Sequence, residues 1–153
     1  MKVIAEDIIA ELTERYKERV KEEMPIGVLM ASREFLVNGR ALLYYIHGVG
    51  YGEAMDFLCT GHGGPYATSL AKFLLKKDLD VFENAKRVAF IISWVAEDVD
   101  VTVGGDPDVI IIRDSNTPTT EPIEQLNEDT IKDMKTKARE IKERLANIIF
   151  GST

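Results

Sequence analysis

Gly61-His62-Gly63-Gly64-Pro65 joins two different sequence patterns, and the change between them divides the fold. Residues 55–60, ahead of the joint, are largely apolar, whereas residues 66–77 have the spacing of an amphipathic helix. Glycines at such a joint let the backbone adopt positive φ and approach a neighbouring group closely. The first N–H groups of the following helix would point at an anion bound there. We therefore expect a turn that leads into a helix, with Gly61, Gly63 and Gly64 as candidate binding residues.

The composition indicates one globular domain over residues 1–153. A chain of 153 residues is long enough to bury a core, and its 45% hydrophobic and 29% charged content is typical of soluble proteins. The longest apolar runs are too short to span a bilayer, and no signal-peptide hydrophobic region follows Met1. The single cysteine, Cys59, excludes an internal disulfide and fits a cytoplasmic location. The net charge of -7 argues against a nucleic-acid partner. We expect no membrane partner and no cofactor.

Upstream of the joint, the pattern predicts one helix and then an antiparallel meander. A stripe of apolar residues predicts a helix over residues 1–23, and Pro25 ends it because the residue before proline avoids the α region. Asn38-Gly39 is a strong hairpin signal between two apolar runs. The three expected strands cover residues 26–32, 41–46 and 53–60, with a glycine bend at 48–52 before the last.

Downstream of the joint, helices dominate. The first helix, residues 66–77, should bury Leu70, Phe73 and Leu74, and Asp78 or Asp80 should cap a second helix that ends near Asp98. The remaining expected elements are a break at Gly104-Gly105, a strand at 109–112 buried on both faces, a tether at 115–122 and a helix at 127–149 within a C-terminal extension, 123–153. The last helix either packs on its own sheet or binds a partner.

The order of these elements and glycines resembles the C-terminal two-thirds of a β-type proteasome subunit, in the N-terminal-nucleophile hydrolase family. The resemblance covers residues 4–113. No single motif is highly specific, and the order and spacing of several together carry the resemblance. These are Met24-Pro25, Asn38-Gly39, Leu43-Tyr44-Tyr45-Ile46, Gly61-x-Gly63, and Glu97-Asp98-Val99-Asp100 ahead of Val103-Gly104-Gly105-Asp106. The resemblance implies an α+β fold, specifically a partial αββα sandwich.

The same resemblance bears on catalysis. Active members of the family use an N-terminal threonine at the start of a strand as nucleophile. This sequence begins with Met1 inside the first helical pattern, so we expect no such threonine. The family's Gly-Ser-Gly loop corresponds to Gly61-His62-Gly63, with histidine in place of serine, and its aspartate corresponds to Asp100. The serine that follows that aspartate falls on Val103. His62 and Asp100 are therefore candidates for a vestigial site.

Several other chemistries can be weighed from the residues alone. His62 could act as a base near neutral pH, although a loop histidine more often bonds locally. A Cys59–His62 nucleophilic pair would need an exposed thiol with a lowered pKa. The same two residues supply only half of the ligands that zinc requires, and the glycine loop has no Gly-Lys-Ser/Thr of a Walker motif. A cluster of acidic side chains could hold a hard cation or form a solvated loop: Asp98, Asp100, Asp106 and Asp108.

Three functional hypotheses follow. The first is a non-catalytic, self-assembling homologue of threonine peptidases, and the alternatives are half of a two-chain threonine-type hydrolase and a small anion-binding module at residues 61–65. The few expected strands cannot close a two-sheet sandwich, and exposed sheet edges and apolar faces favour association. We therefore expect a homo-oligomer, a dimer or higher, with other proteasome-like subunits as further candidate partners.

Overall fold

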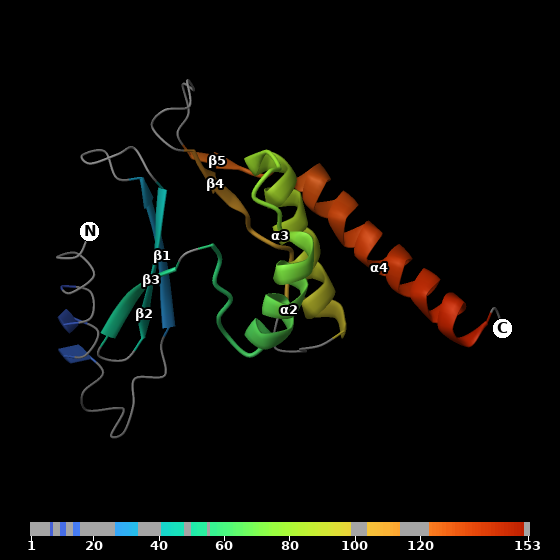
Figure 1. The fold of residues 1–153 in the computed structure, drawn as a ribbon, viewed down its shortest axis with the longest axis horizontal. Coiled ribbons are helices and arrows are strands. Elements are labelled where there is room, and N and C mark those ends of the chain that lie inside the picture. Colours follow the sequence, from blue (N-terminus) through green and yellow to red (C-terminus); the bar gives the residue numbers. More distant parts are fainter. Residues whose placement is uncertain are drawn as a thin grey trace. The chain divides into compact units, whose positions relative to one another are not determined.

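The computed structural model describes residues 7, 10–11, 14–15, 27–33, 41–47, 50–54, 56–98, 104–113 and 123–151 (Figure 1). They belong to two compact units. One comprises Met1–Leu58 and Ile112–Pro122, and the other comprises Cys59–Ile111 and Ile123–Thr153. The described chain combines helices with small antiparallel sheets, so it has the α+β class that the sequence predicts.

The first unit contains a three-stranded meander. Strands β1 (Gly27–Arg33), β2 (Ala41–His47) and β3 (Gly50–Ala54) pair in the order β1-β2-β3, and both pairings are antiparallel. Gly27 lies opposite His47 at one end of the first pair. This arrangement confirms the predicted meander and the positions of its first two strands.

The third strand differs from the prediction. It covers Gly50–Ala54, so Gly50 and Gly52 lie within the strand and form no bend ahead of it. Residues 57–60, predicted as its second half, have no regular structure, and their side chains are half-buried up to Cys59. An apolar connection buried by tertiary packing has the same composition as a strand, which explains the error.

The other predictions for this unit fall only partly on described residues. Residues 7, 10, 11, 14 and 15 are helical, as expected, and Arg15 forms an ion pair with Glu11 at 2.6 Å. The Asn38-Gly39 turn and the tether at 115–122 lie outside the described residues.

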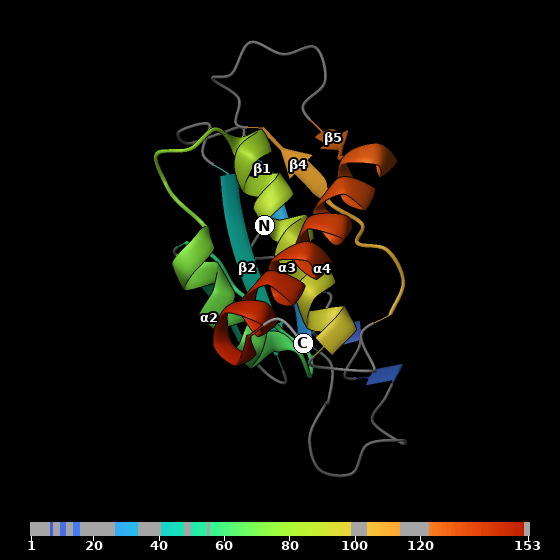
Figure 2. The same ribbon diagram turned by 90° about the vertical axis from the view of Figure 1, so that its right-hand side faces the viewer.

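The second unit consists of three helices and a two-stranded sheet. Its helices are α2 (Gly64–Leu74), α3 (Val81–Asp98) and α4 (Glu128–Phe150). Its strands are β5 (Ile123–Gln125) and β4 (Ile110–Ile112), of which the last residue falls in the first unit. The N–H of Leu126, just after β5, donates to the carbonyl of Val109, just before β4, so the two strands run antiparallel. Helix α3 packs against both α2 and α4, and its course beside α4 can be followed in Figure 2. Strand β5 was not predicted.

Side-chain caps fix the helix ends. The side chain of Asn127 accepts a hydrogen bond from the Thr130 N–H at 2.8 Å, and Asp80 accepts one from the Phe82 N–H at 3.1 Å. Helix α2 ends at Leu74, earlier than predicted, because the amide of Asn84 binds both backbone groups of Lys76. That clasp satisfies backbone groups that a longer helix would have satisfied internally.

The core of this unit lies between the two-stranded sheet, α3 and α4. Its buried residues are Ala85, Ala89, Val109, Ile111, Leu126, Ile131 and Met134. The prediction that residues 109–112 are buried on both faces is wrong, because Ile110 is 59% exposed. One face of the sheet packs on the helices, so side chains alternate between core and solvent. Phe73, predicted to point inward from α2, is also exposed.

The predicted break at Gly104-Gly105 offers a test of backbone conformation. Gly105 has φ of 84°, whereas Gly104 does not have positive φ, and a Cβ at either position would meet no atom within 4 Å. We expect Gly105→Ala to lower the free energy of unfolding by about 1–2 kcal/mol, the cost of a left-handed conformation for an L-residue. Gly104→Ala should change it by less than about 0.5 kcal/mol. Urea unfolding followed by Trp94 fluorescence measures both, and equal effects would contradict this explanation.

Candidate functional site

The Gly61–Pro65 joint is a tight turn that leads directly into α2. Gly61 has φ of 86°, and its carbonyl accepts a hydrogen bond from the Gly64 N–H at 2.9 Å. Helix α2 therefore begins at Gly64, earlier than the predicted Tyr66. A Cβ on Gly64 would lie 3.3 Å from the carbonyl oxygen of Cys59, so the expected close approach exists. The group approached is the chain's own backbone.

This geometry leaves the joint few donors for an anion. The N–H of Gly64 is already bonded to Gly61, and Pro65 has no N–H to offer. Gly63 and Gly64 are buried. A helix N-terminus binds phosphate through several free N–H groups that point at the ligand, and two of the first three residues of α2 cannot contribute one. The geometry favours the interpretation of the joint as a turn.

His62 and Cys59 do not form a catalytic pair. The side chain of His62 is exposed and makes no hydrogen bond or ion pair to any described residue. Cys59 is a free, half-buried thiol, and no hydrogen bond joins it to His62. A base that activates a nucleophile must lie within hydrogen-bonding reach of it. His62 is therefore placed as a solvent-facing residue of the turn.

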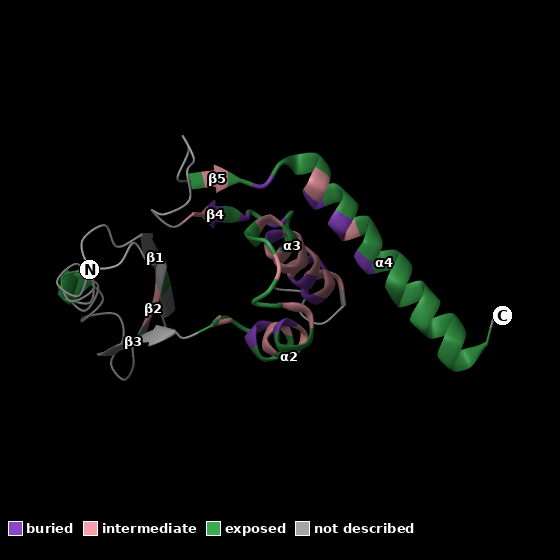
Figure 3. Ribbon diagram, turned by 45° about the horizontal axis from the view of Figure 1, so that its top comes forward, coloured by how far each residue is buried: buried purple, intermediate pink, exposed green. Residues whose placement is uncertain are grey.

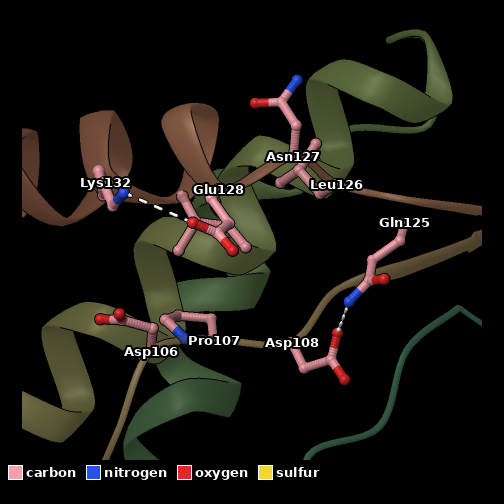
Figure 4. Close-up of a pocket in the computed structure, with 9 residues that line it drawn as sticks. Asp106, Pro107, Asp108, Gln125, Leu126, Asn127, Glu128 and Lys132 are labelled. Atoms are coloured by element: carbon pink, nitrogen blue, oxygen red, sulfur yellow. Dashed lines mark hydrogen bonds and ion pairs between the residues drawn. The ribbon is translucent and has the colours of Figure 1, made fainter.

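Two of the four clustered aspartates line a cavity of about 410 Å³ at the start of α4 (Figure 4). Asp106 accepts a hydrogen bond from the Lys135 ammonium at 2.6 Å, and Asp108 accepts one from the Gln125 amide at 2.7 Å. Glu128, on another wall, lies 3.5 Å from the Lys132 ammonium. Each of these carboxylates thus has a donor from within the unit. The cavity is a polar pocket with paired charges.

The structure describes less of the remaining acidic candidates. Asp98 is the last residue of α3, and Asp100 and Val103 lie outside the described residues. Within the described ranges, no group of three or more His, Cys, Asp or Glu side chains is placed to hold a metal ion. The assignments of Asp98 and Asp100 as cation ligands, and of Asp100 as a vestigial site residue, stay predictions.

The contacts that organise this region join residues far apart in the sequence. Asp106 and Lys135 are separated by 29 positions, and Glu97 and Arg139, which bond at 2.7 Å, are separated by 42. The first pair connects α4 to the segment before β4, and the second connects α4 to α3. Sequence reasoning missed them, because charged residues on the polar face of a helix have no local signal that identifies a distant partner.

The Asp106–Lys135 pair makes a testable electrostatic prediction. The hydrogen bond from Lys135, followed by its positive charge, lowers the pKa of the Asp106 carboxyl. Because the folded-state pKa lies below the unfolded one, the pair stabilises the fold above the unfolded pKa of about 4. That contribution disappears as the pH falls through the folded pKa. The stability of Asp106→Asn should therefore fall less on acidification than that of the unsubstituted chain.

We expect Lys135→Met to move the pKa of Asp106 upward, as measured by NMR titration of its carboxyl carbon. Lys132→Met is the matched control, since Lys132 lowers the same pKa by its charge alone and to a smaller extent. Equal titration curves for the two variants would contradict the assignment of the hydrogen bond as the main cause.

Among the described helices, none combines the length and the apolar character needed to cross a membrane. No model of a known protein family matches the chain, and no curated protein matches it.

Proposed function

We propose that this chain is a non-catalytic, proteasome-subunit-like domain whose role is assembly. The proposed fold is a partial αββα sandwich of the N-terminal-nucleophile type. The observation that carries the proposal is the order of the elements: an antiparallel meander, two helices, two short paired strands and a long C-terminal helix. Apart from β5, these elements follow the order expected from the resemblance of the sequence to β-type proteasome subunits, and this supports the proposal.

The strand starts support a role other than peptide hydrolysis. A threonine peptidase of this kind needs a threonine at the start of a strand. None of the described strands begins with threonine; their first residues are Gly27, Ala41, Gly50, Ile110 and Ile123. The histidine in the position of the family's loop serine faces solvent and has no described partner. These observations support a scaffold over a threonine peptidase.

The described sheets support the assembly role. Strands β1 and β3 are the two edges of the meander, and neither pairs with a further described strand. Leu29, on β1, is 39% exposed. Edge strands with unpaired N–H and C=O groups and apolar neighbours favour pairing with another chain. We propose that the meander associates with a second copy of the chain or with a related subunit.

Covalent probes distinguish a scaffold from a hydrolase. The purified full chain is incubated with a peptide epoxyketone, which captures an N-terminal threonine, and its intact mass is then recorded. We expect no adduct, while an active proteasome preparation treated in parallel is labelled. An adduct on this chain would overturn the proposal. An adduct on a co-purified second chain would favour the alternative, a hydrolase assembled from two polypeptides.

The third hypothesis, an anion-binding module at residues 61–65, has less support. Gly64 and Pro65 cannot donate to an anion, for the reasons given above. We expect phosphate to leave the melting temperature of the chain unchanged relative to chloride at equal ionic strength. A phosphate-dependent rise in the melting temperature that Gly61→Ala abolishes would instead support an anion-binding module at residues 61–65.

A further inference from the structure

The apolar stripe of α4 changes from buried to exposed halfway along the helix (Figure 3). Its first three members, Ile131, Met134 and Ala138, are at most 8% exposed. Its last three, Ile141, Leu145 and Ile148, are 42%, 44% and 79% exposed. We call these last three residues the exposed stripe. The repeat of apolar residues is the same in both halves, so the second half has the pattern of a packing face that no described residue covers to the same extent.

The exposed stripe is bordered by positive charges. At about 100° per residue, Lys137, Lys142 and Arg144 lie within about 90° of the centre of the stripe. The carboxylates of this part of the helix, Glu140 and Glu143, lie further round, towards or on the opposite side. In paired helices, the residues that flank the apolar seam select the partner by charge.

A groove continues the stripe onto the neighbouring helices. It has a volume of about 370 Å³. Leu74 of α2, Phe90 of α3 and Met134 and Ile141 of α4 form its apolar lining. Its charged rim consists of Glu83, Lys86, Arg87 and Lys137, with three cations and one carboxylate. Ile141 belongs to both the groove and the exposed stripe, so the two form one apolar surface with a mainly basic border. We call it the α4 surface.

Two cations of the border, Lys86 and Lys137, can exchange their present partners, whereas Arg87 donates a hydrogen bond to the carbonyl of Leu74 at 2.6 Å. Lys86 is paired with Glu83 at 2.6 Å and Lys137 with Asp133 at 2.7 Å, and both are pairs within one helix. Exposed pairs of this kind contribute about 0–1 kcal/mol, so a carboxylate from another chain can compete with them.

We propose that the α4 surface docks an acidic amphipathic helix of another protein. The apolar face of that helix would lie on the exposed stripe and place a side chain in the groove, while its flanking carboxylates would face the basic border. Charge complementarity decides among the possible occupants. Two copies of α4 paired along this stripe would bring Lys142 and Arg144 against the same cations, which is unfavourable. This inference goes beyond the proposed function, because it concerns a partner other than a second copy.

Two designed peptides test this chemistry on the full chain. Both have leucine at the a and d positions of a helical heptad; one has glutamate and the other lysine at e and g. Fluorescence anisotropy should show that the glutamate peptide binds about tenfold or more tightly than the lysine peptide, with the difference shrinking at high salt. Equal binding of both peptides, or binding of neither, would overturn the proposal.

Matched variants locate the binding surface. Ile148 and Phe150 are 79% and 83% exposed, and they lie on opposite sides of α4, so aspartate at either position should leave the fold intact. We expect Ile148→Asp to weaken binding of the glutamate peptide about tenfold or more, and Phe150→Asp to leave it within about twofold. An equal effect of the two substitutions would place the binding elsewhere and overturn the proposal.

Two further outcomes would replace the proposed partner. Co-sedimentation of the chain with phosphatidylserine vesicles, abolished by Ile148→Asp, would assign the α4 surface to a membrane. A dimer of the chain that Ile148→Asp dissociates, but that the glutamate peptide leaves intact, would assign the α4 surface to a second copy.

Discussion

Ile111→Ala is expected to lower the free energy of unfolding by about 2–5 kcal/mol, and Ile110→Ala is expected to change it by less than about 1 kcal/mol. Ile111 is 3% exposed and belongs to the core cluster, whereas Ile110, the preceding residue of β4, is 59% exposed. Truncation at position 111 removes buried apolar surface and leaves a cavity among residues that can relax only partly. The same truncation at position 110 removes side-chain atoms that largely contact water.

The two substitutions remove the same atoms from neighbouring positions of one strand, so the loss of β propensity largely cancels between them. Urea unfolding reports the difference through Trp94, the only tryptophan of the chain, which lies on α3 in the same unit as β4. Equal losses for the two variants would mean that β4 is covered on both faces, as its continuous β-branched sequence first predicts. That result would contradict the one-sided core.

Ala89→Leu is expected to destabilise the fold by about 1–3 kcal/mol, because a larger side chain must fit where no free space exists. Ala89 is 0% exposed and lies in the cluster formed by α3, α4 and the two-stranded sheet. The added atoms would force either α4 or the sheet away from α3. Leucine and alanine have similar helix propensities, so the intrinsic preference of the helix contributes little to the loss.

Ala146→Leu on α4 is the control for this substitution. Ala146 is exposed, so we expect its replacement to change the free energy of unfolding by less than about 0.5 kcal/mol. Both variants are compared by urea unfolding and by far-ultraviolet circular dichroism of the native state. If Ala89→Leu were as stable as the unsubstituted chain, α3 and α4 would be packed more loosely than the structure shows.

The parts of the fold that the sequence predicts well are those with local causes. Helices α3 and α4 begin where Asp80 and Asn127 offer capping oxygens to backbone N–H groups, and such caps are visible in a sequence. Strands β1 and β2 flank a recognisable turn dipeptide, so their positions and antiparallel pairing were predictable. Each of these signals lies within a few residues of the element that it defines.

The errors have non-local causes. Strand β5 has three residues, too few for a periodic pattern, and it exists because the chain returns to pair with β4. Helix α2 ends where Asn84, on the next helix, binds the backbone of Lys76. The repeat along α4 continues through Ile148, although the described part of the chain buries the stripe only as far as Ala138. Periodicity identifies a face of a helix and does not tell what packs on it.

At the candidate site, too, the sequence predicts the local features and misses the non-local contacts. The sequence places a turn at residues 61–65, which the structure confirms, and a helix start at Tyr66, which lies at Gly64 in the structure. Whether the turn can bind an anion depends on which N–H groups are already used, and the bond from Gly64 to Gly61 becomes visible only in three dimensions. The pairing of Asp106 with Lys135 likewise depends on how α4 packs in its unit.

Sedimentation velocity over a dilution series tests the proposal that the chain is an assembly domain. The full chain is examined from high to low concentration, with circular dichroism of each sample to show that it remains folded. We predict a folded species heavier than the monomer, which dissociates only on dilution. A folded chain that stays monomeric over the whole series would contradict the claim.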